Sequence, residues 1–436
     1  MKQQEKIENI INLPIILFIV IFINYFPLII KNAKTKESFG VGNFQMLICF
    51  IIEIIILCIY FLINFIKNKE EFILNKEIKT NILLLVITTI VLMCVQVYNF
   101  LSNKLNFMDI LNIGCIFINI FILYICVLNL KIKQEHIYNF FKGIVFFTLI
   151  ACIVNLALYY KDIYELFVNG KYKWNIMIKS FFANRNQFAF FLYLGIIADF
   201  MLIKNNKNIL YKIFLLIFGI NLFSTGSRTG IALGVMLSVI IFLTSSKIKL
   251  KTKVITCFLG ILIVLVGFFS IYNLKPEFWQ KISSNFIRMS EVKNFSGRTK
   301  IWNSGIELLK EKPQNILFGI GRFKSVEAIE NLNGRTFTQF HNIYIDLLTT
   351  GGIMELIYIG FIYFSVIKSI MKSNLDKKYK STYIAMFITY AIYIALESFG
   401  RFSIGASDTI CLIFFITIPI LHANSIKENE KEEIEK

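Results

Sequence analysis

The sequence lacks the motifs on which many soluble enzymes build metal, nucleotide and nucleophile sites. It has only three histidines in 436 residues. It also has no zinc-type Cys/His spacing, no Gly-x-x-x-x-Gly-Lys loop and no Gly-x-Ser-x-Gly turn. There is no Asp-x-Asp, and the acids predicted to face outward, including Glu277, Glu291 and Glu327, are scattered. A metal-dependent transferase would need such acids clustered around the ion. We therefore expect no metal site and no cofactor.

Cysteine is present but follows no functional spacing. The residues all fall in apolar runs, and none has the close Cys-x-x-Cys spacing of a zinc or redox site. We interpret them as small hydrophobic side chains. The long polar segment 273–342 has no cysteine and hence no disulfide of its own. The eight cysteines are Cys49, Cys58, Cys94, Cys115, Cys126, Cys152, Cys257 and Cys411.

Long hydrophobic runs dominate the chain, which is 56% hydrophobic. Apolar runs of about 18 to 25 residues are typical of membrane-spanning helices. The first run has no small-residue cleavage site after it, so we expect it to be retained. The pattern predicts an all-α polytopic integral membrane protein whose residues 1–436 form a single transmembrane domain. Twelve spans are expected, at about 12–30, 43–66, 81–101, 108–130, 139–160, 187–203, 209–225, 229–245, 254–272, 343–370, 382–398 and 404–422.

The net charge of +18 would suggest a nucleic-acid partner in a soluble protein. Here the positive residues punctuate the spans instead, and no basic stripe is interleaved with aromatic residues, so we expect no nucleic-acid partner. The lysine-rich segments are predicted to be cytoplasmic, as are both termini. The cytoplasmic segments are 67–80, 131–138, 204–212, 246–253 and 371–380, and the outward segments are 31–42, 102–107, 161–186, 226–228, 273–342 and 399–403.

The outward segment 273–342 is far longer than the others. Residues 300–311 predict an amphipathic helix, which Pro313 cannot continue, and a tight Gly319-Ile320-Gly321 turn follows. The helix could lie on the bilayer surface or form part of a lid over a site at the membrane boundary. These two interpretations are compatible, and a connection of this length is more often functional.

His341 is the strongest candidate for chemistry. It is predicted to face outward at the start of a helix, whereas His136 and His422 lie near cytoplasmic segments. Its imidazole could take a proton from an attacking hydroxyl as a general base, with Asn342 and Tyr344 as polar partners. The alternative is a polar residue that merely begins the helix.

Three arginines have surroundings suited to an anion. Arg185 and Arg228 lie near predicted helix N-termini, and Arg298 precedes the amphipathic helix. Guanidinium groups match phosphate oxygens, and helix N-termini favour anions. The alternative is that these side chains reach lipid headgroups. The tight Gly and Ser surroundings of Arg228 favour the site.

The order of these blocks resembles the O-antigen ligase and Wzy-type polysaccharide polymerase superfamily. The segment His341-Asn342-Ile343-Tyr344, followed by Leu348 and Gly352, is similar to that family's signature. The whole-chain layout, with one long outer loop before the tenth helix, is similar too and suggests a GT-C-like architecture. The other matching blocks are Ser227-Arg228-Thr229-Gly230, Ser296-Gly297-Arg298 with Trp302 and Gly305, and Gly319-Ile320-Gly321.

The resemblance implies a bacterial plasma-membrane enzyme with its active site on the outer face. Such enzymes transfer an oligosaccharide from undecaprenyl diphosphate to a hydroxyl of an acceptor glycan, without a nucleotide. By this resemblance Arg228 and Arg298 would clamp the diphosphate, with Arg185 a weaker candidate, and His341 would orient or deprotonate the acceptor. The product would be a capsular, exopolysaccharide or cell-wall polymer, or a ligated glycan. Besides the bilayer, a flippase and a chain-length regulator are the partners implied.

A lipid-linked oligosaccharide flippase or other transporter is the competing hypothesis. Twelve helices suit many transporters, and the acids Glu53, Asp199 and Asp408 fall inside or near predicted spans. Against this, the two halves show no convincing repeat, and one half alone carries the long loop.

Overall fold

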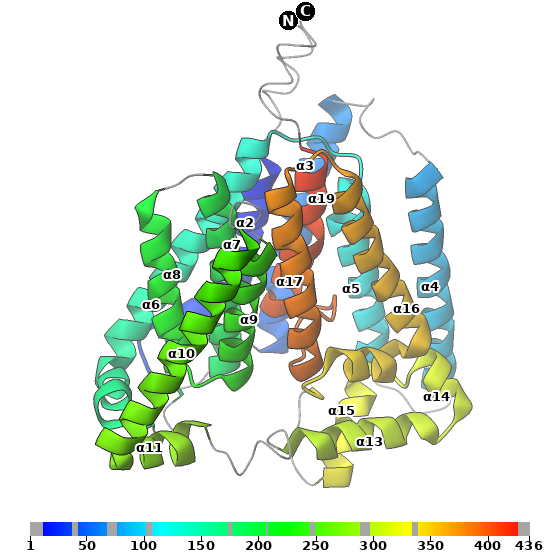
Figure 1. The fold of residues 1–436 in the computed structure, drawn as a ribbon. Coiled ribbons are helices and arrows are strands. Elements are labelled where there is room, and N and C mark those ends of the chain that lie inside the picture. The colour runs from blue at the N-terminus through cyan, green and yellow to red at the C-terminus, as the bar shows by residue number, and fades with distance from the viewer. Residues whose placement is uncertain are drawn as a thin grey trace, which may run out of the picture.

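The computed structural model describes residues 12–36, 42–67, 76–101, 107–172, 177–205, 208–244, 249–287, 297–333 and 339–425. Every element in these ranges is helical. Long helices form a bundle, and short helices gather at one end of it (Figure 1). Glu291 and Ser296, which the sequence analysis used, lie outside the described residues.

Each of the twelve predicted spans coincides with a helical segment. Within the described residues, nine of these segments are long and apolar enough to cross a membrane. Seven contain one helix each: α2 (Leu13–Asn32), α3 (Asn43–Lys67), α4 (Lys76–Leu101), α6 (Gln134–Asn169), α7 (Arg185–Asn205), α10 (Leu250–Leu274) and α16 (Ile343–Lys372). The other two are the segment 108–127, formed by α5 (Phe107–Leu123) and a short 3-10 helix after it, and the segment 406–423. That last segment contains α18 (Ala406–Leu412), a π-helical stretch and α19 (Ile418–Ala423).

The other three predicted spans are helical, but their helices are not both long enough and apolar enough to be counted as membrane-crossing. Helices α8 (Ile209–Ser224) and α9 (Arg228–Thr244) are apolar but shorter, and α17 (Lys377–Leu396) begins among lysines. The separation of α8 from α9 by a short turn is as predicted. The count of twelve membrane spans stays a prediction.

The connections divide between the two ends of the bundle as the charge pattern predicts. The start of α2 and the end of α19 lie at the upper end in Figure 1. There the Asn424 amide donates to the Leu128 carbonyl at 2.8 Å. The lower end carries α11 (Pro276–Lys281), α13 (Arg298–Lys310), α14 (Pro313–Phe318) and α15 (Arg322–Asn333). Which end faces outward stays a prediction.

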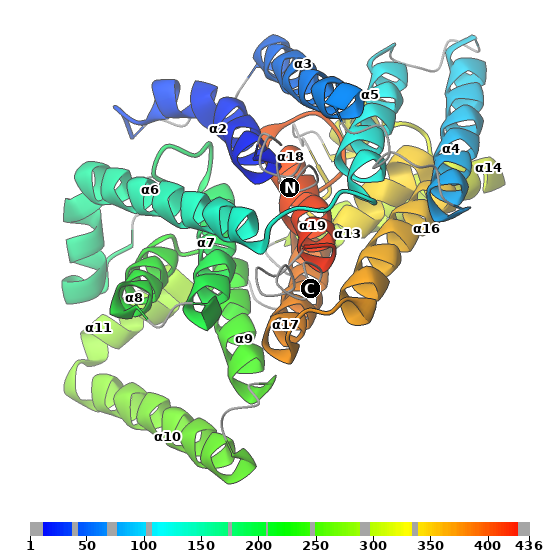
Figure 2. The same ribbon diagram turned by 90° about the horizontal axis from the view of Figure 1, so that it is seen from above.

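Helix α7 is, with the segment 406–423, one of the two most buried of the nine membrane-length segments that the structure describes. Figure 2 shows it in the interior of the bundle, while α10 lies at the periphery. Residues Phe188 to Ala198 of α7 are almost completely buried. Aromatic rings fill the space towards α17, as where Phe190 stacks on Phe399 with ring centroids 4.5 Å apart. The N-terminus of α7 is therefore held firmly at the lower end.

Several predicted boundaries are wrong. Helix α6 continues to Asn169 through a kink at Tyr159, so the segment 161–186 is partly helical. Helix α17 ends at Leu396, where 382–398 was predicted. The segment 273–342 carries α15 in addition to the predicted helix. The sequence of α15 interleaves its apolar residues with Asn, Glu and Lys, so hydrophobic periodicity did not predict this helix. Ser325 and Ile329 of α15 are nevertheless buried.

Two backbone contacts attach the outer segment to α16. The amides of Ile320 and Gly321 donate to the carbonyls of Thr349 and Thr350 at 2.8 and 3.2 Å. Helix α16 is interrupted just beyond them at Gly352, whose φ is +70°. A Cβ on Gly352 would lie 2.3 Å from the backbone of Leu317, so only glycine fits there. The glycine turn of the sequence motif thus docks α14 and α15 beside the start of α16.

Candidate functional site

His341 occupies a constrained position just before α16. Its backbone φ is +55°, a left-handed conformation that residues other than glycine adopt at a cost of about 1–3 kcal/mol. The surroundings hold it there. The Asn342 side chain caps α16 by accepting from the amide of Tyr344 at 3.0 Å, and the Trp302 indole donates to the Phe340 carbonyl at 3.0 Å. The helix start and α13 therefore fix the backbone on both sides of the imidazole.

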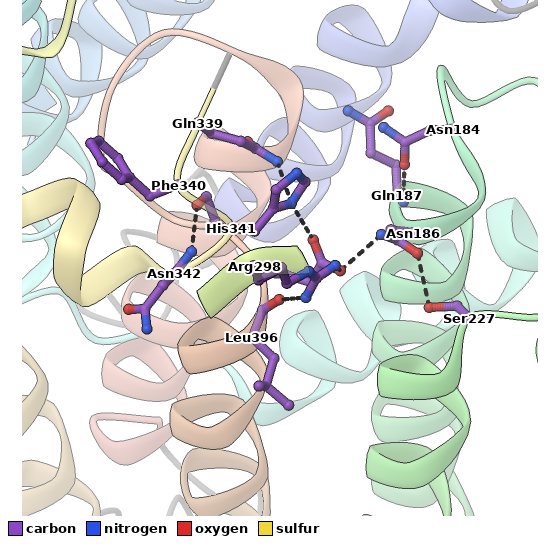
Figure 3. A network of polar contacts seen from close by, with 12 residues as sticks. Asn184, Asn186, Gln187, Ser227, Arg298, Gln339, Phe340, His341, Asn342 and Leu396 are labelled. Carbon is purple, nitrogen blue, oxygen red and sulfur yellow. Dashed lines mark hydrogen bonds and ion pairs between the residues drawn. The ribbon is translucent and has the colours of Figure 1, made fainter. Parts of the chain in front are cut away.

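The imidazole contacts a buried carboxylate that sequence reasoning missed. His341 Nδ1 lies 3.1 Å from Oε2 of Glu397, whose side chain is 2% exposed. The other carboxylate oxygen of Glu397, Oε1, accepts from the side-chain amide of Asn186 at 2.8 Å and pairs with Arg298 (Figure 3). A carboxylate removed from water needs such partners. Glu397 thereby connects α7, α13 and α17 to His341.

Arg298 is held at both ends of its guanidinium fork. One terminal nitrogen pairs with Glu397, and the other donates to the Leu396 carbonyl at the end of α17. Arg298 is also the first residue of α13, after Gly297 with a φ of +83°. The structure therefore brings His341 and Arg298 together, and Glu397 is the link between them.

Arg185 and Arg228 lie at the same end of the bundle, each as the first residue of its helix. The residues beside them are joined, since the Ser227 hydroxyl donates to the side-chain oxygen Oδ1 of Asn186 at 3.1 Å. Asn186 in turn donates to Glu397, so both helix starts are tied to the network around His341 (Figure 3). Positive side chains at helix N-termini oppose the helix dipole. A bound anion would offset this repulsion.

The two predicted supporting residues have different roles. Asn342 caps α16, and its backbone amide donates to the Ser398 hydroxyl at 3.0 Å. The Tyr344 hydroxyl donates to the Ala391 carbonyl at 3.1 Å and so fastens α16 to α17. Both position the chain around His341, which is a structural contribution to the site.

The imidazole has one nitrogen in the network and one outside it. Nδ1 faces Glu397 and also lies 3.3 Å from the Gln339 amide. Nε2 makes no hydrogen bond to any residue in the described ranges, and the side chain is 32% exposed. A carboxylate that accepts from Nδ1–H leaves Nε2 as the proton acceptor. The arrangement can therefore receive a proton from a hydroxyl.

An apolar pocket of about 220 Å³ begins beside the site. It lies between α16 and α17, and its lining includes Ile343, the first residue of α16, which follows His341 and Asn342 in the chain. Aliphatic and aromatic side chains supply most of its surface. The lining residues include Ile343, Tyr344, Leu347, Leu356, Ile359, Tyr363, Ile367, Phe387 and Ile394.

The other acids considered in the sequence analysis have local partners or lie apart from the site. Glu53 accepts from the Asn24 amide at 2.9 Å and the Thr409 hydroxyl at 3.1 Å. Asp408 accepts from the backbone amides of Gly400 and Arg401, and Asp199 is buried within α7. Across the described ranges, no three His, Cys, Asp or Glu residues are grouped so that they could hold a metal ion.

Sequence reasoning missed Glu397 because the residue was placed inside the eleventh predicted span. An acid at the outer end of an apolar run was the available signal. Asn186 and Gln339 gave no comparable signal, since single amides are common in polar connections.

Comparison with known proteins supports the family resemblance. The family model described as O-antigen ligase matches residues 213–360 of the chain. That range contains Arg228, Arg298 and His341, whereas Arg185 and Glu397 lie outside it. No curated protein matches the chain.

Proposed function

Residues 213–360 of this multi-pass membrane protein match the model of the O-antigen ligase family, which implies an enzyme of the glycosyl-transfer type, and from that match we propose its reaction. The enzyme transfers oligosaccharide repeats from undecaprenyl diphosphate to a hydroxyl of an acceptor glycan. Its product is a capsular, exopolysaccharide or cell-wall polymer. An O-antigen-type ligase would differ only in the acceptor.

The contact of His341 with Glu397 is the observation that carries the proposal. In the reaction the acceptor hydroxyl gives its proton to Nε2 as its oxygen attacks the anomeric carbon. The bond from that carbon to the carrier diphosphate breaks, and its electron pair stays on the phosphate oxygen. Glu397 stabilises the imidazolium that forms, because its carboxylate lies against Nδ1. Direct displacement of this kind inverts the anomeric carbon.

Arginines supply the positive charge that the leaving diphosphate requires. Charge grows on the phosphate oxygens as the bond breaks, and preorganised donors stabilise that charge most in the transition state. Arg228 and Arg298 are the proposed clamp, with Arg185 as a further contributor. All three begin helices whose N-termini also favour an anion. The proposed reaction needs no metal ion.

The apolar pocket between α16 and α17 supports a lipid-linked donor. Its lining includes Ile343 and Tyr344 of the first turn of α16, and it presents mainly aliphatic and aromatic side chains. An isoprenoid chain has the apolar surface that such a pocket favours. A donor seated there would bring its diphosphate to the end of the bundle that carries the arginines.

Replacing His341 by alanine tests the proposal. We expect polymer formation to fall by about 100-fold or more, because a positioned general base contributes roughly that factor. His136→Ala is the matched control, since His136 is half-buried near the other end of the bundle. Polymer is measured by gel analysis of surface glycan, with membrane levels of each variant measured in parallel. Wild-type polymer in a membrane-inserted His341→Ala variant would refute the base assignment.

A further inference from the structure

A second, polar cavity lies beside the His341 network. Its volume is about 230 Å³, and its lining comes from α2, α3, the start of α7, α15 and the loop before α18. Gln339 lines it and also lies 3.3 Å from His341 Nδ1. Gln187, the neighbour of Asn186, lines it as well. The polar lining residues are Asn24, Gln187, Arg322, Gln339, Arg401, Ser407 and Asp408.

Two arginines contribute the positive charge of this polar cavity. The Arg322 guanidinium donates to the Ser403 hydroxyl at 2.9 Å. Arg401 Nε lies 3.7 Å from an oxygen of Asp408, and its side chain is 16% exposed. That Nε is buried and makes no hydrogen bond to any part of the chain that the structure describes. The Arg401 side chain also lines the cavity wall.

The neighbouring carboxylates already accept backbone hydrogen bonds. Asp408 accepts from Gly400 and Arg401 at 3.1 and 2.9 Å, and Asp109 caps α15 by accepting from the Phe323 amide at 2.7 Å. Among the described residues that line the cavity, Arg322 and Arg401 are cationic and Asp408 is the single acid, so the lining keeps an excess of positive charge. Burial and the charge of Arg401 lower the pKa of Arg322 to about 10 despite these acids. An added anion would relieve that repulsion.

We propose that the polar cavity binds an anionic group of the lipid-linked glycan substrate beside His341, either a carboxylate of an acidic sugar or a phosphate of the carrier lipid. This inference rests on the proposed function. Guanidinium forks recognise both groups, and the amides of Asn24, Gln187 and Gln339 suit the hydroxyls of an attached sugar. Drug-sized ligands occupy pockets of roughly 300 Å³ or more. The smaller volume here suits one acidic sugar ring or a diphosphate.

Binding of two probes to purified full-length protein in detergent tests this assignment and separates its two sources. Inorganic diphosphate represents the carrier lipid, and glucuronate represents an acidic sugar of the glycan. Calorimetry gives the dissociation constant of each probe. We expect Arg401→Gln to raise the dissociation constant of at least one probe by about tenfold, because a charge-assisted hydrogen bond contributes roughly that factor. Loss confined to diphosphate identifies the carrier, and loss confined to glucuronate identifies the acidic sugar.

Two controls keep the result interpretable. Lys310→Gln removes one charge from an exposed site on α13 and should leave both constants unchanged. Ala406→Leu adds volume at the cavity wall without changing charge and should weaken the same probe as Arg401→Gln, so the inference does not depend on one variant folding. The cavity assignment would be overturned if Arg401→Gln and Ala406→Leu both bound both probes with wild-type affinity. It would also be overturned if the wild-type protein bound neither probe. The binding assay is independent of transfer, so an active His341→Ala variant would refute the proposed base and leave the cavity assignment standing.

Discussion

The buried carboxylate of Glu397 accepts from partners on three other segments of the chain. The Glu397 carboxylate contacts the side chains of Asn186, Arg298 and His341, and the Glu397 side chain is 2% exposed. Removing one partner of a buried ion pair leaves the other charge poorly solvated. The loss of folding free energy is therefore larger than for an ion pair on the surface. Glu397 is a positioning residue in the proposed mechanism, since it acts on the acceptor through His341.

The variant Glu397→Gln keeps the shape of this side chain but removes its charge. We expect kcat for transfer to fall by roughly 10- to 100-fold with a smaller change in KM, because the imidazolium loses its support in the transition state. Steady-state transfer assays on purified protein measure the two constants. Glu165→Gln is the control, because Glu165 forms a partly exposed ion pair with Lys171 at 3.7 Å. A rise in KM alone, with kcat unchanged, would contradict this role.

Close helix contacts transmit the position of the outer segment to the site. Gly305 on α13 faces Phe340 and Ile345, so that a Cβ there would lie 2.5 Å from the Phe340 ring. The buried face of α13 thus packs on the start of α16, and the same helix carries Arg298 at its first turn. The spacing between α13 and α16 therefore sets the spacing between Arg298 and His341.

The variant Gly305→Ala should push α13 away from Phe340. We expect transfer to fall by about tenfold or more, because displacements of about 1 Å at a catalytic group have effects of that size. The measurement is polymer yield normalised to the amount of protein in the membrane. Gly260→Ala in α10 is the matched control, since a Cβ there meets nothing within 4 Å. Equal yields from the two variants would show that α13 does not set the site geometry.

Across the whole molecule, the His341 network lies at the end of the bundle opposite the start of α2, where α7 and α16 begin and α17 ends. The helix ends that flank the lysine-rich connections lie at the other end, and the positive-inside rule predicts that this end is cytoplasmic. Orientation thus decides whether the site meets substrates outside the cell.

Single cysteines introduced into a variant whose native cysteines are replaced by alanine test the orientation. An impermeant maleimide should label Lys310→Cys on α13 in intact cells, and Lys212→Cys on α8 only after permeabilisation. Both positions are exposed in the structure and lie at opposite ends of the bundle. Each protected or labelled thiol is read by mass shift on a gel. The reverse pattern would place the site in the cytoplasm.

Much of the architecture was predictable because long apolar runs can satisfy their backbone groups in a membrane only as helices. All twelve predicted ranges coincide with helical segments, and the charge pattern sorted their connections correctly between two ends. Boundaries failed where apolar composition continued past a turn, as at Leu396, or where a helix had a weak pattern, as in α15. The expected roles of Arg185, Arg228 and Arg298 at a diphosphate stay predictions.

The sequence by itself determined the helical class, the alternation of the connections, and the choice of His341 and Arg298 as residues of interest. These follow from local composition, motif order and charge, which need no knowledge of packing. Only the tertiary structure decided that Glu397 joins those two residues and that Arg322 and Arg401 share a polar cavity. Such juxtapositions depend on how helices far apart in the chain pack and where each one ends. A difference of two residues in the end of α17 is enough to move a carboxylate from a predicted span into the site.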